Sequence, residues 1–160
     1  MEHLFRPWRL EYVTAPEEDG DGCFLCRGAQ TDDPAASWVL CRRSRTLAIL
    51  NAYPYNSGHV MVAPLRHVGD LEELDAEEQA EVMGLVIECL RALRAEYAPH
   101  GFNVGVNLGQ VAGAGVPGHV HVHLVPRWSG DTNFMPVVGQ AKVLPEDLAG
   151  TYGRLAPRLQ

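Results

Sequence analysis

Three histidines stand at alternate positions within residues 118–128: His119, His121 and His123. Strict alternation with apolar residues predicts a β-strand, in which positions i, i+2 and i+4 share one face. The residues between them would pack into the core on the other face: Val120, Val122 and Leu124. A buried imidazole needs hydrogen-bond partners, so three on one face indicate either a metal site or a nucleophile with its supporting groups.

A glycine-rich segment, residues 108–118, leads directly into these histidines. Glycines let backbone N–H groups approach a ligand closely, and successive N–H groups in a loop can cradle a phosphate. The N–H groups expected to stabilise charge on phosphoryl oxygens belong to four residues: Gly113, Ala114, Gly115 and Val116. The combination of loop and histidines predicts a phosphate-binding site.

A second group of candidate ligands is the C-x-x-C pair formed by Cys23 and Cys26. This spacing is typical of half a zinc site, and also of a redox motif when it lies on a thioredoxin-like βαβ unit. No such unit follows in the sequence. The alternatives left are a zinc site, completed by two residues from elsewhere, and two reduced thiols near the surface.

The composition limits the classes of function. The chain has 13 Lys and Arg against 20 Asp and Glu, a formal net charge of −7, which argues against binding to a nucleic acid polymer but leaves a small phosphate ligand open. No apolar run approaches 18 residues, so we expect no membrane span, and the N-terminus lacks the apolar segment of a secretory signal. We therefore expect a cytoplasmic protein.

The elements that must position these groups suggest one α+β domain over residues 1–160, with a core over 23–128, an N-terminal arm and a C-terminal extension. Strands are expected at 38–41, 46–50, 59–63, 102–107 and 118–128, and a loop at 27–37. A capping box at Asp75 and Glu78 predicts a long helix to about Tyr97. A C-terminal helix should begin near Pro145 and reach about Leu155. Short connections favour an antiparallel sheet.

The residues from His119 to Val125 match the His-φ-His-φ-His-φ-φ signature, with φ apolar, so the chain resembles the histidine triad (HIT) family. The stretches 51–60 and 63–67 are also similar to that family, and the resemblance covers roughly residues 23–128. The continuation through 126–135 looks like the bacterial members akin to diadenosine tetraphosphate phosphorylases, with a more distant likeness to the fragile-histidine-triad hydrolases. The resemblance implies a HIT-like fold, a homodimer and a nucleotide site.

The resemblance also implies roles for particular residues. His121 would be the nucleophile that attacks a nucleoside 5′-phosphate, with His123 donating to a phosphate oxygen or to the leaving oxygen. Asn51 would bind ribose hydroxyls, and Asn107 would join the nucleotide site. Zinc would be held as in related triad proteins, by two thiolates and two imidazoles: Cys23, Cys26, His67 and His119. A closed set of four ligands is structural.

Several functions fit these expectations. The first is a hydrolase or nucleotidyltransferase that cleaves dinucleoside polyphosphates through a nucleotidyl-histidine, with any Mg²⁺ brought by the substrate. A phosphate-dependent phosphorylase of the same substrates and a non-catalytic nucleotide-binding module are the alternatives. Many family members carry Gln or Ser shortly before the first triad histidine, where this chain has Ala114 and Gly115. The sequence therefore leaves open whether water or inorganic phosphate is the acceptor.

Overall fold

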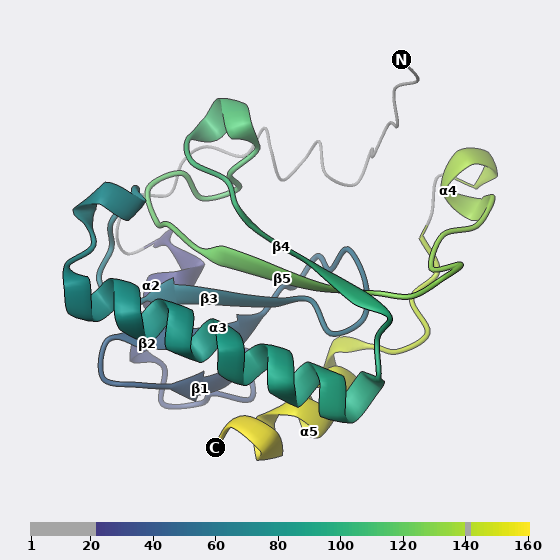
Figure 1. Ribbon diagram of the computed structural model, residues 1–160, viewed down its shortest axis with the longest axis horizontal. Coiled ribbons are helices and arrows are strands. Elements are labelled where there is room, and N and C mark those ends of the chain that lie inside the picture. Colours follow the sequence, from purple (N-terminus) through teal and green to yellow (C-terminus); the bar gives the residue numbers. More distant parts are fainter. Residues whose placement is uncertain (1–21, 140–141) are drawn as a thin grey trace.

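Five strands form one antiparallel sheet in the computed structural model, which describes residues 22–139 and 142–160 (Figure 1). In chain order they are β1 (Val39–Arg42), β2 (Thr46–Leu50), β3 (Val60–Pro64), β4 (Gly101–Val106) and β5 (Val122–Arg127). Across the sheet the order is β1-β2-β3-β5-β4, so β5 lies between β3 and the edge strand β4. The expected α+β fold is confirmed. The N-terminal arm expected for the first 22 residues lies, up to residue 21, outside the described residues.

Helices cover both faces of the sheet. The long helix α3 (Ala76–Tyr97) and the C-terminal helix α5 (Leu148–Leu159) pack on one face, and the short α2 (Phe24–Gln30) packs on the other. A further short helix, α4 (Met135–Val138), projects from the body of the molecule (Figure 1). Short 3-10 turns occur at Leu71–Glu73 and Gln110–Ala112.

The strand sequences fit this three-layer arrangement because apolar residues fill both faces. In β2, Ala48 and Leu50 join the core under α3 and α5, whereas Leu47 and Ile49 join the core under α2. Side chains alternate between the faces of a strand, so a strand covered on both sides becomes a continuous apolar run. Ile49, for example, is only 3% exposed and packs in the core under α2.

Helix α3 begins with the predicted capping box. The Asp75 side chain accepts a hydrogen bond from the backbone N–H of Glu78, and the Glu78 side chain accepts one from that of Asp75. Glu78 is buried and also pairs with Arg66, which lies just after β3. This pair fixes the start of α3 against the chain that leads to His67. The helix ends at Tyr97, and the next residue, its C-cap Ala98, adopts the left-handed conformation at φ 43°.

Glu78 should make the stability of the fold depend on pH. The Arg66 guanidinium, followed by the backbone bond at the cap, lowers the pKa of Glu78 to about 2. A lowered carboxyl pKa contributes stability above the unfolded value, about 4.3, and the contribution is lost as pH falls toward 2. We expect the unfolding free energies of wild type and Glu78→Gln to converge between pH 4.5 and 2 in urea titrations. A constant difference over that range would contradict the assignment.

Three expectations about the elements were wrong in detail. Residues 24–30 form a helix although a loop was expected from residue 27, because burial of Leu25 and Gly28 against the sheet stabilises a helix that lacks a capping side chain. Strand β5 begins at Val122 because the Val120 N–H bonds to the carbonyl of Val68, outside the ladder. Helix α5 starts after its cap Asp147 and continues to Leu159.

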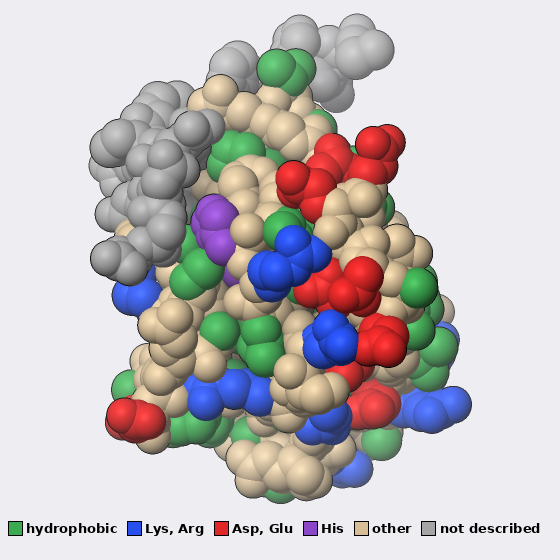
Figure 2. Space-filling model, turned by 90° about the vertical axis from the view of Figure 1, so that its left-hand side faces the viewer, with side chains coloured by type: hydrophobic (Ala, Val, Ile, Leu, Met, Phe, Trp, Pro, Cys, Tyr) green, Lys and Arg blue, Asp and Glu red, His purple; other side chains and the backbone are tan. Residues whose placement is uncertain are grey.

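One face of the molecule carries charges of both signs (Figure 2). Figure 2 shows acidic and basic side chains next to one another over the face near the start of α3, where Arg45 pairs with Asp75 at 3.4 Å. None of the described helices is both long enough and apolar enough to span a bilayer.

Candidate functional site

The first part of the site is a cluster of two cysteines and two histidines. The ligand atoms of Cys23, Cys26, His67 and His119 all lie within 4.8 Å of one another. The Cys26 Sγ atom is 3.2 Å from Nδ1 of His67 and 3.5 Å from Nδ1 of His119, and the Cys23 Sγ atom is 3.4 Å from the latter. The structure thus brings together all four residues that were expected to hold zinc, and this donor set suits that ion.

The four candidate ligands come from three separate parts of the chain. Cys23 is the N-cap residue of α2 and Cys26 lies one turn later, so both thiols face the same region. His67 follows β3, and His119 precedes β5. Space around His67 is tight, because a Cβ atom added to Gly118 would lie 3.1 Å from its Nε2 atom. The cluster therefore joins α2 to the residues that follow β3 and to the residues that precede β5.

Hydrogen bonding fixes which nitrogen of His119 faces the thiols. Its Nε2 atom lies 2.9 Å from the carbonyl oxygen of Pro64, which can only accept, so Nε2 carries the proton. Nδ1, with its lone pair, is then directed to Cys23 and Cys26. The ring is fully buried, and this burial is the largest of the effects that lower the pKa of His119 to about 4. A neutral imidazole with Nδ1 unprotonated is the form that binds a metal.

His121 is held in the opposite tautomer. Its Nδ1 atom lies 2.7 Å from the carbonyl oxygen of His119, so Nδ1 carries the proton and Nε2 keeps a lone pair. Burial lowers the pKa of the His121 ring, which favours this neutral form. The carbonyl that holds this ring comes from His119 and not from the glycine-rich loop. His119, whose ring faces the two thiols, thus also supplies the carbonyl that orients His121.

A fourth histidine, His59, completes the group, and sequence reasoning gave it no role. It is 1% exposed, and its Nε2 atom lies 3.0 Å from Nδ1 of His123. The Nδ1 atom of His59 accepts a hydrogen bond from the Tyr55 N–H at 3.1 Å, so the proton of His59 is on Nε2 and is donated to His123. Neutral His123 must then carry its own proton on Nε2. The rings of His121 and His123 meet edge to face, with centroids 4.7 Å apart.

The turn that presents His59 is tied to β5 by a polar network. The Asn56 Nδ2 group donates to the carbonyl of Pro126 at 2.9 Å and to Asp131 at 2.8 Å. Asp131 also pairs with Arg127 at 2.6 Å, and this guanidinium holds the pKa of the Asp131 carboxyl well below its usual range. The network fixes the distance between the loop before β3 and the strand that carries His123. The network joins residues of the 51–60 stretch to residues of the 126–135 stretch, but no local sequence pattern indicates that these two stretches meet.

Part of the glycine-rich loop is bonded to itself. The N–H of Gly113 donates to the carbonyl of Gln110, and the N–H of Ala114 donates to that of Gly109 at 3.4 Å. The Asn107 side chain donates to the carbonyl of Gly113 at 3.3 Å. Two of the four N–H groups expected to bind phosphate are therefore used inside the loop. The candidates that remain are the N–H groups of Gly115 and Val116.

Asn51 lies at the end of β2, beside the histidines. Its backbone N–H donates to the carbonyl of His59 at 3.0 Å, and its side-chain oxygen accepts from the N–H of Tyr53 at 2.8 Å. The side chain thus shapes the turn after β2. A role of Asn51 in binding a nucleotide stays a prediction.

The sheet order and the four-histidine group beside a Cys₂His₂ cluster define a histidine-triad type of protein. A model of the HIT domain family matches residues 34–130, more than half of the chain, and the chain belongs to the HIT family. It is 41% identical to the AP-4-A phosphorylase of Mycobacterium tuberculosis, over 98% of this chain and 83% of that protein. It is 30% identical to Protein hit of Bacillus subtilis, over 87% and 95% of the two chains.

A solved structure with the same fold is the Zn-bound histidine triad family protein from Mycobacterium smegmatis. The TM-score is 0.69 with 27% sequence identity, and the match covers 87% of this chain and 94% of that one. The Cys₂His₂ cluster of this chain could hold a metal ion.

Proposed function

We propose that this protein is a nucleotidyl-transferring enzyme that cleaves dinucleoside polyphosphates, with His121 as the nucleophile. The observation that carries this proposal is the 2.7 Å hydrogen bond from Nδ1 of His121 to the His119 carbonyl, which leaves the lone pair on Nε2. A non-catalytic nucleotide-binding module would need no such fixed tautomer. The similarity to an AP-4-A phosphorylase supports the substrate class.

In the first chemical step, Nε2 of His121 attacks the α-phosphorus and the bond from phosphorus to the bridging oxygen breaks. The polyphosphate leaves as an anion, so no proton has to be transferred to it. The His121 ring becomes a cation that keeps its Nδ1 proton, and the His119 carbonyl stabilises it. The Nε2–H of His123 is the donor that can hydrogen-bond a phosphoryl oxygen or the leaving oxygen as charge develops.

In the second step an acceptor attacks the nucleotidyl-histidine, and the electrons of the N–P bond return to Nε2 of His121. We propose inorganic phosphate as the acceptor, supported by the activity in the name of the 41% identical relative. Phosphate and an adenylyl group then form ADP. The N–H groups of Gly115 and Val116 would bind phosphoryl oxygens, and Asn51 would contact ribose. Any Mg²⁺ would arrive with the polyphosphate, whose oxygens it prefers.

The acceptor is tested by incubating the enzyme with diadenosine tetraphosphate and radiolabelled inorganic phosphate. We expect ATP and labelled ADP in equal amounts, with turnover dependent on phosphate. Sodium sulfate at equal ionic strength is the control for salt effects. Formation of AMP and ATP without incorporation of label would replace phosphate by water as the acceptor. No cleavage under either condition would overturn the proposed substrate class.

His59 should support turnover without taking part in bond formation. We expect His59→Ala to lower kcat by about 10- to 100-fold, because His123 loses the donor that fixes its tautomer. His59→Gln should recover part of the rate, since its amide can still donate. Steady-state kinetics measures both, and His100→Ala is the control because that side chain bonds to Ser129 at the surface. Wild-type kcat in His59→Ala would exclude this role.

We further propose that the Cys₂His₂ cluster binds one structural zinc ion. Its support is the closed set of four soft and borderline ligands and the Zn-bound M. smegmatis protein. When bound, the ion would fix α2 to the chain around β3 and β5. His119 would then be held from two sides, by the metal at Nδ1 and by the Pro64 carbonyl at Nε2.

The assembly and location are proposals as well. We propose a homodimer that pairs through β4, because this strand is at the edge of the sheet and its Val104 side chain is 48% exposed. We also propose one domain for the whole chain and a cytoplasmic location without nucleic acid or membrane partners. None of the four cysteines, all in the described region, forms a disulfide, as a reducing compartment would require.

A further inference from the structure

Lys142 is the only lysine of the chain, and its ammonium group lies at the turn before β3. The Nζ group donates a hydrogen bond to the backbone carbonyl of Tyr55, in a partly buried position. Lys142 belongs to the segment between α4 and α5, so the bond joins residues that are 87 positions apart. An ammonium is a compact charge with three donors, which suits the binding of a single carbonyl oxygen.

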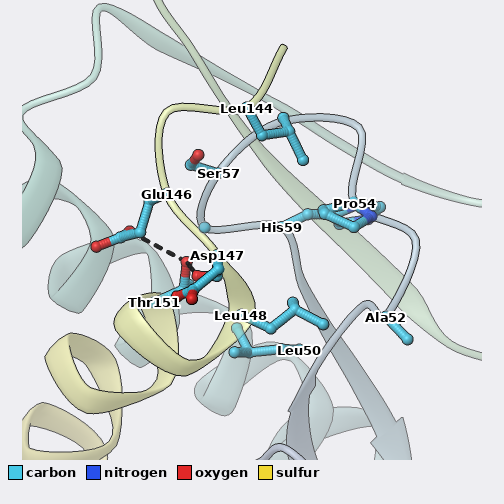
Figure 3. A pocket seen from close by; sticks show the side chains of 11 residues that line it. Leu50, Ala52, Pro54, Ser57, His59, Leu144, Glu146, Asp147, Leu148 and Thr151 are labelled. Atoms are coloured by element: carbon cyan, nitrogen blue, oxygen red, sulfur yellow. Dashed lines mark hydrogen bonds between the residues drawn. The ribbon is translucent and has the colours of Figure 1, made fainter. Parts of the chain in front are cut away.

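The segment that carries Lys142 is held to the rest of the protein. Glu146, near the start of α5, accepts a hydrogen bond from the Tyr97 hydroxyl of α3 at 2.7 Å and pairs with Arg154 at 2.7 Å. Leu144 lines one cavity together with three residues of the turn before β3: Pro54, Ser57 and His59 (Figure 3). The segment is thus bonded to α3 through Glu146 and borders the turn through Leu144.

Tyr55 connects Lys142 to the histidine group. The Tyr55 N–H donates to Nδ1 of His59 at 3.1 Å, and the rings of these two residues lie against each other with centroids 4.7 Å apart. Because Nδ1 of His59 accepts, the proton on its Nε2 is donated to Nδ1 of His123, 3.0 Å away. The position of Tyr55 therefore sets the tautomers of both histidines.

The turn has further bonds on either side of Tyr55. The Asn51 side chain accepts from the Tyr53 N–H at 2.8 Å, and the Asn56 side chain donates to the Pro126 carbonyl at 2.9 Å. These bonds do not involve Lys142. Loss of the lysine should therefore leave the turn in place and the fold nearly as stable, while it loosens Tyr55.

We propose that Lys142 is a positioning residue for nucleotidyl transfer. Its hydrogen bond to the Tyr55 carbonyl keeps the Tyr55 N–H on His59, and through His59 it keeps the proton of His123 on Nε2. The inference rests on the proposed function for the role of His123 as the donor to phosphoryl oxygens. The chain of hydrogen bonds itself is present without substrate, and Lys142 acts through it without touching the substrate.

Lys142→Met is the direct test, because methionine has a similar unbranched side chain without the donor. Long-range proton–nitrogen NMR spectra distinguish the two tautomers of a neutral histidine. We expect one tautomer of His59 in wild type, with the proton on Nε2, and a mixture in Lys142→Met. The kcat of this variant should fall about three- to ten-fold, with KM and Tm nearly unchanged. Lys142→Arg can still donate to the carbonyl and should recover most of the rate and the single tautomer.

Combination with His59→Ala shows whether the lysine acts through His59. If it does, Lys142→Met should cause no further loss of kcat in a His59→Ala background, because the connecting residue is already gone. A further loss of the same size in that background would overturn the proposal. Equal losses in Lys142→Arg and Lys142→Met, or a raised KM at unchanged kcat, would do so too.

Arg91→Met is the matched control, since it removes the same charge from an exposed position on α3 and should behave as wild type does. The NMR measurement separates this inference from the proposed function. If wild type cleaves no dinucleoside polyphosphate, the proposed function fails, but the tautomer of His59 still tests the link from Lys142. The wild-type tautomer of His59 in Lys142→Met would overturn the link itself.

Discussion

Replacing His121 with asparagine is expected to lower kcat by roughly 10⁴-fold or more, the size of effect seen when an enzyme loses its nucleophile. The asparagine amide can still donate to the His119 carbonyl, so the fold and the local hydrogen bond are kept. It has no lone pair that can attack phosphorus. Nucleotide affinity should change much less, because the proposed contacts to ribose and phosphate come from other residues.

The measurement that separates binding from chemistry is acid-quench trapping with substrate labelled at the α-phosphate. Wild type should carry transient label on an imidazole, and His121→Asn should carry none while still binding AMP. His123→Asn is the comparison: it should slow the reaction less, since His123 stabilises charge and forms no bond to phosphorus. Equal turnover in wild type and His121→Asn would end the assignment of the nucleophile and leave the histidines as a binding surface.

The sheet and the long helix could be predicted because their signals are local. The capping box at Asp75 and Glu78, the apolar run in β2 and the alternation in β5 are each set by residues a few positions apart. Helix α2 was missed for the opposite reason. Residues 27–30 carry no large apolar side chain and the N-cap Cys23 makes no capping hydrogen bond, so burial of Leu25 against distant strands decides the structure.

The same distinction applies to the site. The alternating histidines indicate chemistry by themselves, but the register that brings His59 next to His123 depends on β3 pairing with β5, which lies about sixty residues later. The carbonyl that orients His121 was also beyond reach, because it follows from the departure of His119 and Val120 from the sheet ladder. The spacing of Cys23 and Cys26 indicated half of a ligand set, whereas His67 and His119 were implied by the resemblance to the HIT family. The structure groups all four.

Loss of the zinc ion is expected to have the second large effect. Cys23→Ser should lower the zinc content, measured by elemental analysis of protein purified without added metal, from about one ion per chain to near zero. The free energy of unfolding should fall by about 3–5 kcal/mol, because the proposed ion would join α2 to the chain near β3 and β5. For a chain of this length that corresponds to a fall in Tm of about 10 °C.

Turnover should respond to the metal through the His119 backbone. Without zinc, the Nδ1 side of His119 loses its partner, and the carbonyl that orients His121 becomes less well fixed, so kcat should fall while nucleotide affinity changes little. Cys89→Ala is the matched control, because Cys89 is fully buried in the core under α3, away from the Cys₂His₂ cluster. This variant should keep the zinc content of wild type. Chelation of wild type with EDTA should reproduce the behaviour of Cys23→Ser. Wild-type zinc content and Tm in Cys23→Ser would show that the four residues form no metal site.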